Sequence, residues 1–571
     1  MEQSIINRKT TRRALLKAMG LSGLAALAAP ILAACSSPAA PAPTEAPKAA
    51  TPAQAAATPT SAPAAEPTAT TAAAEPTATV AGAATAAPTA QATEAAASQG
   101  ETLVASKLTP ENWNPEVLRK LAGTLKEVDT KGAVAKVMPL DSKGKLTYWY
   151  VGPTQATPDI DKQADQAFWQ AWNEMVPGVP MKVGDNVQNL DYNQMLDKLR
   201  TAAAGNSAPF AARLPIMWAV EFAAKGLLEE MGPEDLGYSK DSYWPGALKS
   251  VTWKGKLYGV PTNNETMAFI WNRKIFQDAG LDPDKPPATW EDVVAYSKAI
   301  KEKTGKAGYG LVARVNAGNT PFRFMPMLWA YGSGALDEAE ENPTMEKVLI
   351  NNDGGVQVFE LIRKMYIDDK SVPTSALTNT QTENGDLFIS GQIAMMISHP
   401  SEYASLMDKA KKATGSDKAR AEEVVANTMY GLIPAGPVRR AVVFGGSNYV
   451  SFTDQAAGTK VPRDLVKGFG AFLCGPEWSV RLNWSGSNPS HLDGFKTVWM
   501  KERLDTIKFL DVTSSMLPYG IPFPVIPEAN EIMNNIVPTA MQNVLTGKMT
   551  PKQAADDAAE KIQKIIAQRK S

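Results

Sequence analysis

Apolar runs of strand length alternate with amphipathic helical segments from Lys145 onward. The run 145–152 predicts a strand, and apolar residues at helical spacing over 160–175 predict the helix that follows it. A short apolar run at 179–183 predicts a second strand, and the pattern over 192–203 predicts a second helix that stops at Gly205. Strands that alternate with helices are typical of βαβ units, so we expect mostly parallel sheets.

The segment 256–300 departs from this alternation. An apolar stretch ends at Pro261, the polar residues 262–266 follow, and the apolar run 267–271 starts at once. We interpret this as two strands joined by a polar connector without a tight hairpin. The pattern fits a crossing between two α/β bodies and fits a strand–loop–strand inside one domain equally well. Thr289 with Asp292 is a capping-box pattern and predicts a helix that continues to residue 300.

Later apolar segments extend the same alternation to the end of the chain. Further helices are predicted over 324–331, 356–366 and 551–565, and further strands over 309–312, 392–397 and 442–452. The run 392–397 is almost continuously apolar, which is typical of a strand that is buried on both faces. Between the last two strands, residues 430–434 are interpreted as a second crossing.

The first 35 residues have the pattern of an export signal. Arg12 and Arg13 precede an apolar stretch at 18–34, which is too short and too rich in Ala and Gly for a membrane-spanning helix. The paired arginines resemble the twin-arginine export signal, with the general secretory route as the alternative. The four residues that end at Cys35 resemble the lipobox of bacterial lipoproteins, which implies cleavage before Cys35 and a lipid on its sulfur. An unmodified thiol is the alternative.

The next segment, 36–100, has no aromatic residue and consists almost entirely of Ala, Pro, Thr and Glu. It cannot bury enough apolar surface to offset its ordering entropy, so we expect a disordered tether. As a flexible coil, it would span roughly 45 Å. The charged extension 101–144 follows, and its sequence indicates no function.

Composition excludes several kinds of protein. The chain has 58 Lys and Arg against 59 Asp and Glu, so it lacks the basic excess of a nucleic-acid binder. With two histidines and no spaced Cys/His cluster, we expect neither a metal site nor a cofactor. Cys474 has no disulfide partner if Cys35 carries lipid, and its apolar neighbours predict a buried thiol. About 470 residues remain after the signal and tether, and a chain of that length usually forms at least two lobes.

Several segments between Lys145 and the end resemble the extracellular solute-binding proteins of ABC transporters, in the carbohydrate-binding group that includes the maltose-binding protein. The segments are 206–230, 256–300, 391–403, 430–452 and the C-terminal helix. The resemblance implies a two-lobed α/β fold of the type II periplasmic-binding-protein class, in which 256–300 forms the first hinge. The implied divisions are 145–265 for the first part of lobe 1, 266–430 for lobe 2, 431–505 for the return to lobe 1, and 506–571 for a C-terminal helical segment on lobe 2 and the hinge.

The resemblance also implies ligand-binding residues in a cleft between the lobes. Sugar sites combine flat aromatic surfaces with carboxylates and amides that bind hydroxyl groups. Trp218 and Glu221 match a Trp-x-x-acid motif of the family, and Glu265 matches a hinge glutamate. Phe322 and Tyr403 match two aromatic positions of the second lobe. Packing in the core or exposure on the surface are the alternatives for each of these residues.

The chain departs from the family pattern at one important point. His399 and Ser401 replace the glycine and the principal tryptophan of a Gly-Pro-Trp-x-aromatic motif, so one stacking platform is missing. His399 is predicted either to bind solute or to be structural. Possible replacements for the platform are Trp149, Trp329 and Trp484, and Asn448 is a further predicted contact because it follows two glycines.

The resulting hypothesis is a lipid-anchored, monomeric receptor outside the cytoplasmic membrane. It would capture a small solute and deliver it to the transmembrane subunits of an ABC permease, without covalent chemistry. A mono- or oligosaccharide is the first expectation, while a polyol, glycerol phosphate or another small polar compound remains open. A secreted hydrolase with paired carboxylates and a surface adhesin or sensor module are the alternatives.

Overall fold

The structure is a computed structural model that describes residues 103–155, 157–316, 319–482 and 484–570. The predictions for the signal at 1–35, for Cys35 and for the tether at 36–100 lie outside the described residues. The described residues all belong to one unit, and the strands within it are arranged in two main sheets.

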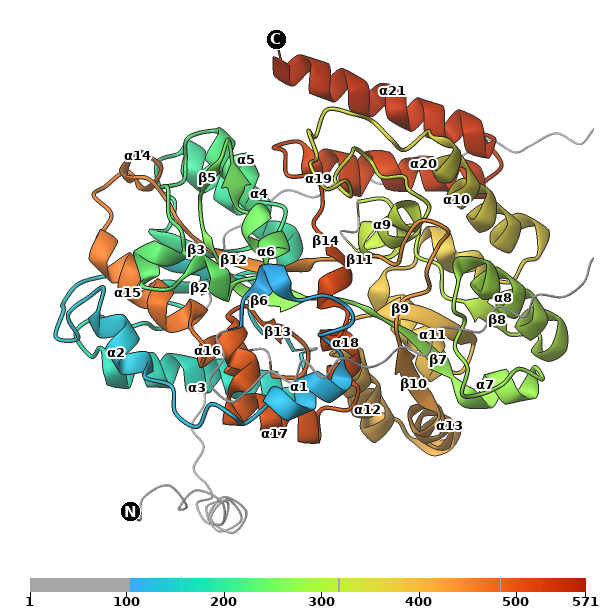
Figure 1. Ribbon diagram of the computed structural model, residues 1–571, viewed down its shortest axis with the longest axis horizontal. Coiled ribbons are helices and arrows are strands. Elements are labelled where there is room, and N and C mark those ends of the chain that lie inside the picture. The colour runs from blue at the N-terminus through green and yellow to red at the C-terminus, as the bar shows by residue number, and fades with distance from the viewer. Residues whose placement is uncertain (1–102, 156, 317–318, 483, 571) are drawn as a thin grey trace, which may run out of the picture. The chain divides into compact units, whose positions relative to one another are not determined.

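The first sheet has six strands in the order β13-β6-β12-β3-β1-β2 (Figure 1). The strands span β1 Tyr148–Tyr150, β2 Val187–Asn189, β3 Ala211–Pro215, β6 Val260–Glu265, β12 Gly445–Ser451 and β13 Asn488–Pro489. Strand β1 lies between β2 and β3 in parallel, whereas β12 is antiparallel to both β3 and β6. Strand β12 therefore returns from a distant part of the chain to the middle of this sheet.

The second sheet has four strands in the order β10-β7-β9-β8. The strands span β7 Ala268–Asn272, β8 Ala307–Tyr309, β9 Ile393–Ser398 and β10 Thr428–Gly431. Strand β7 is antiparallel to its neighbours β9 and β10, and β8 is parallel to β9. The pairing is thus less parallel than predicted, because β7 runs away from the first crossing while the other three strands run towards it. Two small sheets pair β4 Thr252–Trp253 with β5 Lys256–Leu257 and β11 Val442–Val443 with β14 Gly520–Ile521.

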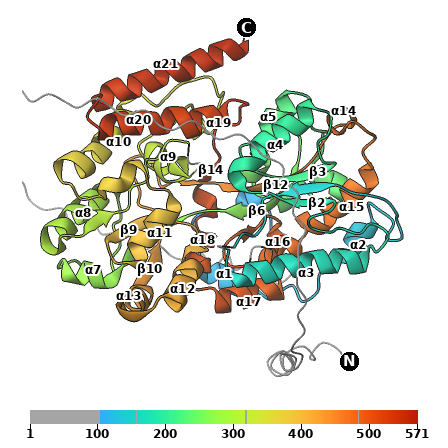
Figure 2. The same ribbon diagram turned by 180° about the vertical axis from the view of Figure 1, so that it is seen from behind.

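Helices cover both sheets. The α-helices span α1 Pro115–Leu121, α2 Thr130–Ala135, α3 Asp159–Met175, α4 Tyr192–Ala204, α5 Ala219–Ala224, α6 Pro245–Lys249, α7 Arg273–Asp278, α8 Trp290–Thr304, α9 Thr320–Ala330, α10 Asp353–Arg363, α11 Gln381–Ile389, α12 Glu402–Lys412, α13 Gly415–Ala426, α14 Asp454–Ala457, α15 Arg463–Cys474, α16 Trp478–Arg481, α17 Val498–Thr506, α18 Leu510–Ser514, α19 Ala529–Glu531, α20 Val537–Leu545 and α21 Pro551–Lys570. Helices α6, α15 and α16 contact β6 of the first sheet, and α8 and α11 contact the second sheet. Helices α20 and α21 lie side by side and pack on α10, as both views show (Figure 1, Figure 2).

The polar stretch that was predicted to be a connector is mostly strand. Strand β6 continues to Glu265, so only Thr266 and Met267 separate it from β7. Polar residues are accommodated in a buried strand here because neighbouring segments accept hydrogen bonds from their side-chain amides. The Asn264 side chain donates to the Pro489 carbonyl at 3.0 Å, and the Asn263 side chain donates to the Ser487 hydroxyl at 3.0 Å. The crossing itself is anchored where the Thr266 hydroxyl donates to the Thr513 carbonyl.

Several other elements follow their patterns closely, but two do not. The capping box of Thr289 and Asp292 starts α8, and the apolar run at 392–397 forms β9. The strand predicted at 309–312 shares only Tyr309 with β8. The strand predicted at 179–183 is wrong, since the pairing strand is β2 at Val187–Asn189. Val179 and Met181 are buried, so their apolar character reflects packing beside a turn. The Asn186 side chain organises that turn by accepting from the Lys182 amide at 2.9 Å.

The extension at 101–144 is integrated into the fold. Trp113 is 1% exposed, and its indole N–H donates to the Ser514 carbonyl at 3.0 Å. Its ring lies edge-on to Trp244 and to Phe495. The extension therefore packs against the segment that leads from β13 to the C-terminal helices.

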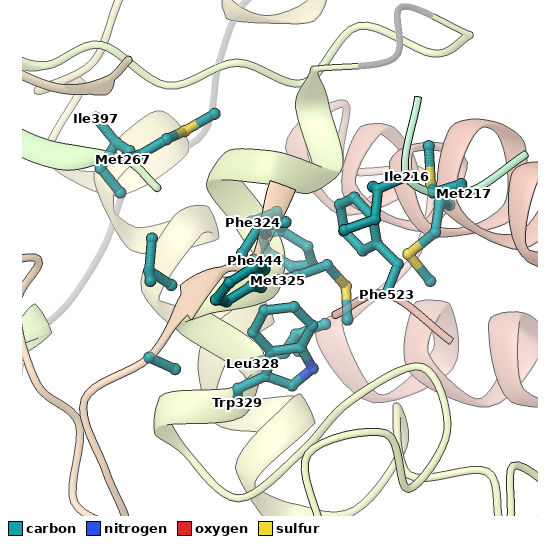
Figure 3. Packing of buried hydrophobic residues seen from close by; sticks show 14 of the residues in the cluster. Ile216, Met217, Met267, Phe324, Met325, Leu328, Trp329, Ile397, Phe444 and Phe523 are labelled. Atoms are coloured by element: carbon teal, nitrogen blue, oxygen red, sulfur yellow. The ribbon is translucent and has the colours of Figure 1, made fainter. Parts of the chain in front are cut away.

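A large apolar cluster runs beneath the segments that connect the two sheets. Figure 3 shows Phe523 beside Ile216 and Met217, which follow β3, with Trp329 of α9 close by. The ring centroids of Phe523 and Trp329 are 6.3 Å apart. In a second cluster, the predicted buried thiol of Cys474 is confirmed, and burial raises its pKa.

Candidate functional site

A cavity of about 660 Å³, here called the central cavity, lies where ends of both sheets meet. This volume is within the range of small-molecule sites. One wall comes from the six-stranded sheet and the segments that follow its strands, and it includes Arg213, Ile216, Glu265 and Ser447. The opposite wall comes from the half that contains the four-stranded sheet, and it includes Arg314, Phe322, Thr382 and His399. A solute in this cavity would therefore contact both halves of the molecule.

A neighbouring cavity of about 570 Å³, here called the side cavity, shares Tyr192 and Asn316 with the central one. Its walls include Trp218 and Glu221 on one side and Glu528 near the start of α19 on the other. Because the two cavities share wall residues, they form neighbouring parts of one candidate site.

Glu265 and His399 face each other across the first crossing. The Glu265 carboxylate accepts from the Ser487 hydroxyl at 3.0 Å and from the Asn263 amide at 3.2 Å. Its other oxygen lies 3.9 Å from His399 Nδ1. Burial lowers the pKa of His399 to about 4, with Glu265 opposing and Arg323 adding to this effect. The imidazole is therefore neutral at pH 7 and presents one donor and one acceptor to the cavity.

Phe322 supplies the aromatic surface of the central cavity. It lies near the start of α9, where Thr320 anchors the preceding loop by donating to the Arg314 carbonyl at 2.6 Å. Its ring is edge-on to Phe523 at a centroid distance of 4.9 Å, and it lies 6.3 Å from the His399 ring. The ring is thus held by packing from below while it lines the cavity.

In the side cavity, Glu221 is already neutralised by two cations. Arg200 binds both carboxylate oxygens, at 2.6 and 2.8 Å, and Lys225 binds one of them at 2.7 Å. Burial pushes the pKa of Glu221 upward, but the hydrogen bonds from Arg200 and Lys225 outweigh it and leave the pKa below its ordinary value. Trp218 beside it is only 2% exposed and packs on Tyr192 with ring centroids 5.1 Å apart.

Four predicted site residues, Trp149, Tyr403, Asn448 and Trp484, line neither cavity. Tyr403 packs edge-on against Phe509, and the Asn448 side chain donates to the Ser250 hydroxyl at 3.1 Å. Trp484 lines a separate surface hollow of about 250 Å³. Ligand contacts of these residues stay predictions, but the structure does not bring them together with Glu265.

Trp329, the remaining candidate for a replacement stacking platform, is fully buried. Its indole N–H donates to the Glu338 carboxylate at 2.8 Å. The ring therefore belongs to the core and presents no face to a solute.

Two arginines in the central cavity were missed. Arg213 lies in the middle of β3 and is only 6% exposed, whereas Arg314 lies in the loop after β8 and is exposed. A sequence signal for Arg213 existed, since a single arginine interrupts an otherwise apolar strand of alanine and leucine. Arg314 has no comparable signal, because an exposed basic residue in a loop is ordinary.

No helix within the described residues is both long and apolar enough to cross a membrane.

Two α/β halves joined by repeated crossings around a shared cavity define the class of type II periplasmic binding proteins, and solved structures confirm this fold. The chain aligns with a solute-binding protein of Thermotoga lettingae bound to α-D-tagatose (TM-score 0.59, 23% identity, 74% of this chain and 100% of that one). It aligns likewise with maltose-bound T. maritima MalE3 (TM-score 0.60, 18% identity, 74% and 100%).

Sequence comparison gives the family. Residues 155–478 match the model of the bacterial extracellular solute-binding proteins, and the chain belongs to that family. A binding protein of Brucella abortus is 24% identical over 398 residues, which cover 68% of this chain and 86% of the relative. The sn-glycerol-3-phosphate-binding periplasmic protein UgpB of Shigella dysenteriae is 24% identical over 442 residues, which cover 74% and 92%.

Proposed function

We propose that this protein is the solute-binding component of an ABC importer and that it holds a small carbohydrate in the central cavity. The observation that carries the proposal is that this cavity takes one wall from each half of the molecule. A solute that contacts both walls stabilises the closed arrangement of the two halves, and its binding free energy shifts an open–closed equilibrium. The permease would recognise the closed form.

Within the cavity, we assign different roles to three predicted residues. Phe322 offers a flat apolar surface to the C–H face of a sugar ring, and Glu265 accepts hydrogen bonds from its hydroxyl groups. Neutral His399 donates one hydrogen bond and accepts another. Trp218 and Glu221 would contact only a solute long enough to reach the side cavity, because they line that neighbouring space.

Location outside the cytoplasmic membrane agrees with the family's description as extracellular. We further propose that Cys35 carries the lipid, that the signal at 1–35 uses the twin-arginine route, and that 36–100 is the tether. The protein would act as a monomer with the permease subunits as its partners.

We also propose that the protein carries out no covalent chemistry on its solute. A glycosidase needs one carboxylic acid with a raised pKa to protonate the leaving group. The pKa of Glu221 lies below its ordinary value, and its two cationic partners leave it no proton to donate. Turnover of labelled oligosaccharides that is lost in a Glu265→Gln variant would instead support the hydrolase alternative.

A thermal-shift screen against sugars, polyols, amino acids and polyamines tests the proposed function. A ligand at 100 times its dissociation constant adds about 2.7 kcal/mol to the free energy of unfolding. We expect shifts with carbohydrates or polyols that decrease in a Phe322→Ala variant. Tyr403→Ala is the matched control, because that ring lies outside both cavities. Shifts with amino acids alone would contradict the carbohydrate assignment.

A further inference from the structure

The guanidinium of Arg213 is buried without an anionic partner. It donates through Nε to the Thr262 hydroxyl at 3.1 Å and through Nη2 to the Asn263 amide oxygen at 2.8 Å. Both acceptors are neutral, and Nη1 has no hydrogen-bond partner among the described residues. Arg213 also forms no ion pair with any of the described residues. A buried charge without a counter-charge is costly, so such an arrangement needs an explanation.

The nearest candidates for a counter-charge are occupied elsewhere. The oxygen of Glu265 that faces this region accepts from Asn263 and Ser487, and the other oxygen faces His399. Asp165 lies on the same side of the sheet as Arg213, because Tyr150 is the strand partner of Arg213 and its hydroxyl donates to the Asp165 carboxylate at 3.1 Å. This carboxylate also accepts from the Trp169 indole at 3.1 Å and forms no ion pair with Arg213. Burial raises the pKa of Asp165, and the hydrogen bonds from Tyr150 and Trp169 together with the positive charge of Arg213 oppose this only in part.

A second guanidinium lines the opposite wall of the same cavity. Arg314 is exposed and forms no ion pair among the described residues. Its positive charge helps to lower the pKa of Glu383, after the larger effect of the hydrogen bond from Thr380. Glu383 is engaged by Thr380 at the start of α11 and is not one of the cavity's lining residues. Glu265 is therefore the only carboxylate among the lining residues, against two arginines.

We infer that the solute carries one acidic group, a carboxylate or a phosphate ester, which binds between Arg213 and Arg314 in the central cavity. This inference rests on the proposed function and narrows its substrate class to an acidic sugar or a phosphorylated polyol. The anion supplies the counter-charge that Arg213 lacks, and the planar guanidinium suits such oxyanions. Because the two arginines belong to opposite walls, the same anion also draws the halves together.

Other residues that line the central cavity can bind the uncharged part of such a solute. Tyr192, Ser447 and Thr382 place hydroxyl-bearing side chains along the same cavity, and Phe322 adds an apolar surface. A neutral sugar could use these groups but would leave Arg213 without a counter-charge. The structure therefore favours acidic over neutral members of otherwise identical pairs of compounds.

The test uses the purified chain and matched pairs of probes in thermal-shift and calorimetric titrations. Glucose is compared with glucuronate and with glucose 6-phosphate, and glycerol is compared with sn-glycerol 3-phosphate. We expect at least one acidic probe to bind about tenfold or more tightly than its neutral partner, with an affinity that falls as salt is added. The carboxylate and phosphate probes distinguish the two possible sources of the anion.

Three variants locate the anion. Arg213→Gln should weaken the binding of the acidic probe by about 30-fold or more, since it removes one side of a desolvated charge pair. Arg314→Gln should weaken this binding by about fivefold, and both changes should weaken the binding of a neutral probe less than that of its acidic partner. Arg420→Gln is the matched control, because this exposed arginine of α13 pairs with Asp417 away from the central cavity. If Arg213→Gln does not fold, the binding of the acidic probe to Arg213→Lys and Arg314→Gln tests the inference instead.

Different failures have different meanings. If neutral sugars bind as tightly as their acidic partners and Arg314→Gln changes nothing, the inference is overturned while the proposed function stands. If no acidic probe binds, the inference is likewise overturned. If only amino acids or polyamines bind, the proposed carbohydrate function fails and the inference fails with it.

Discussion

Two buried arginines in the half of the molecule that contains the six-stranded sheet have opposite environments. Arg503 of α17 is fully buried and donates to three backbone carbonyls, those of Trp484 at 2.8 Å, Val480 at 3.1 Å and Ser487 at 2.6 Å. Arg213 of β3 has only two side-chain acceptors and faces the central cavity. A guanidinium whose three nitrogens all donate to backbone carbonyls holds a loop in place, whereas one with a nitrogen that has no partner is available to a ligand.

Ser487 connects these two regions. Its carbonyl accepts from Arg503, and its hydroxyl donates to Glu265 in the central cavity. Residues 484–487 are therefore fixed from the core side, and Ser487 in turn positions a cavity carboxylate. The comparison predicts that Arg503 contributes mainly to stability and that Arg213 contributes mainly to solute binding.

The largest expected effect is that of Arg503→Met on stability. Three backbone carbonyls lose their donor, and Asp161 loses the cation that opposes the rise of its pKa by burial. We expect a loss of about 3–5 kcal/mol in the free energy of unfolding, measured by urea titration at pH 7. Arg420→Gln should change it by less than about 0.5 kcal/mol. A loss for Arg503→Met as small as that of the control would show that the carbonyls find other donors.

The next effect is on acid stability. The pKa of His399 is about 4 in the folded protein and 6.5 ordinarily, so the unfolded chain binds a proton in this window that the folded chain does not. Stability therefore falls as the pH falls from 6.5 towards 4, by up to about 1.4 kcal/mol per pH unit. His399→Gln should lose about 2 kcal/mol less than the parent between pH 7 and 5.

His491 provides a comparison for that measurement, because burial also lowers its pKa to about 4 in a region away from the cavity. His491→Gln should reduce acid sensitivity in the same way. A bound solute should change the effect of the His399 substitution and leave that of His491 unaltered. Equal acid sensitivity of His399→Gln and the parent chain would contradict the prediction.

A smaller effect on the free energy of unfolding is expected for the Arg213→Met variant in the absence of solute. The substitution removes a costly buried charge, and the Thr262 hydroxyl lies 3.1 Å from the Asn263 oxygen and can replace one lost donor. We expect a change below about 2 kcal/mol in urea titrations, clearly less than for Arg503→Met. If the two substitutions cost the same, Arg213 is structural and the contrast between the two arginines disappears.

The smallest effect concerns Glu221→Gln in the side cavity. The substitution weakens the contacts with Arg200 and Lys225, whose side chains are 37% and 54% exposed, so we expect a loss of about 1 kcal/mol at pH 7. Because the folded pKa lies below its ordinary value of 4.5, this stabilisation is present above that pH and is lost as the pH falls through the folded pKa. Glu230→Gln, which alters an exposed pair, is the control. A difference that does not decrease as the pH falls below 4.5 would have another origin.

Residue patterns and family resemblance predicted much of the candidate site, but not all of it. Glu265, Phe322 and His399 were predicted and line the central cavity. Trp218 and Glu221 were predicted with them and lie in the side cavity, where Glu221 has partners that no linear pattern reveals. Arg213 was missed because its significance depends on which charges are absent around it, and those neighbours come from β6 and from distant loops.

The sequence by itself determined the local elements and the broad class of this protein. Periodic apolar residues, the capping box at Thr289 and the buried run of β9 act through neighbours in the chain, so they can be read without tertiary contacts. Only the tertiary structure decided that polar Asn263 and Asn264 continue a strand and that Arg213 lacks a counter-charge. The asparagines depend on hydrogen-bond partners that lie more than 200 residues away in the chain. The environment of the arginine depends on the arrangement of the whole cavity.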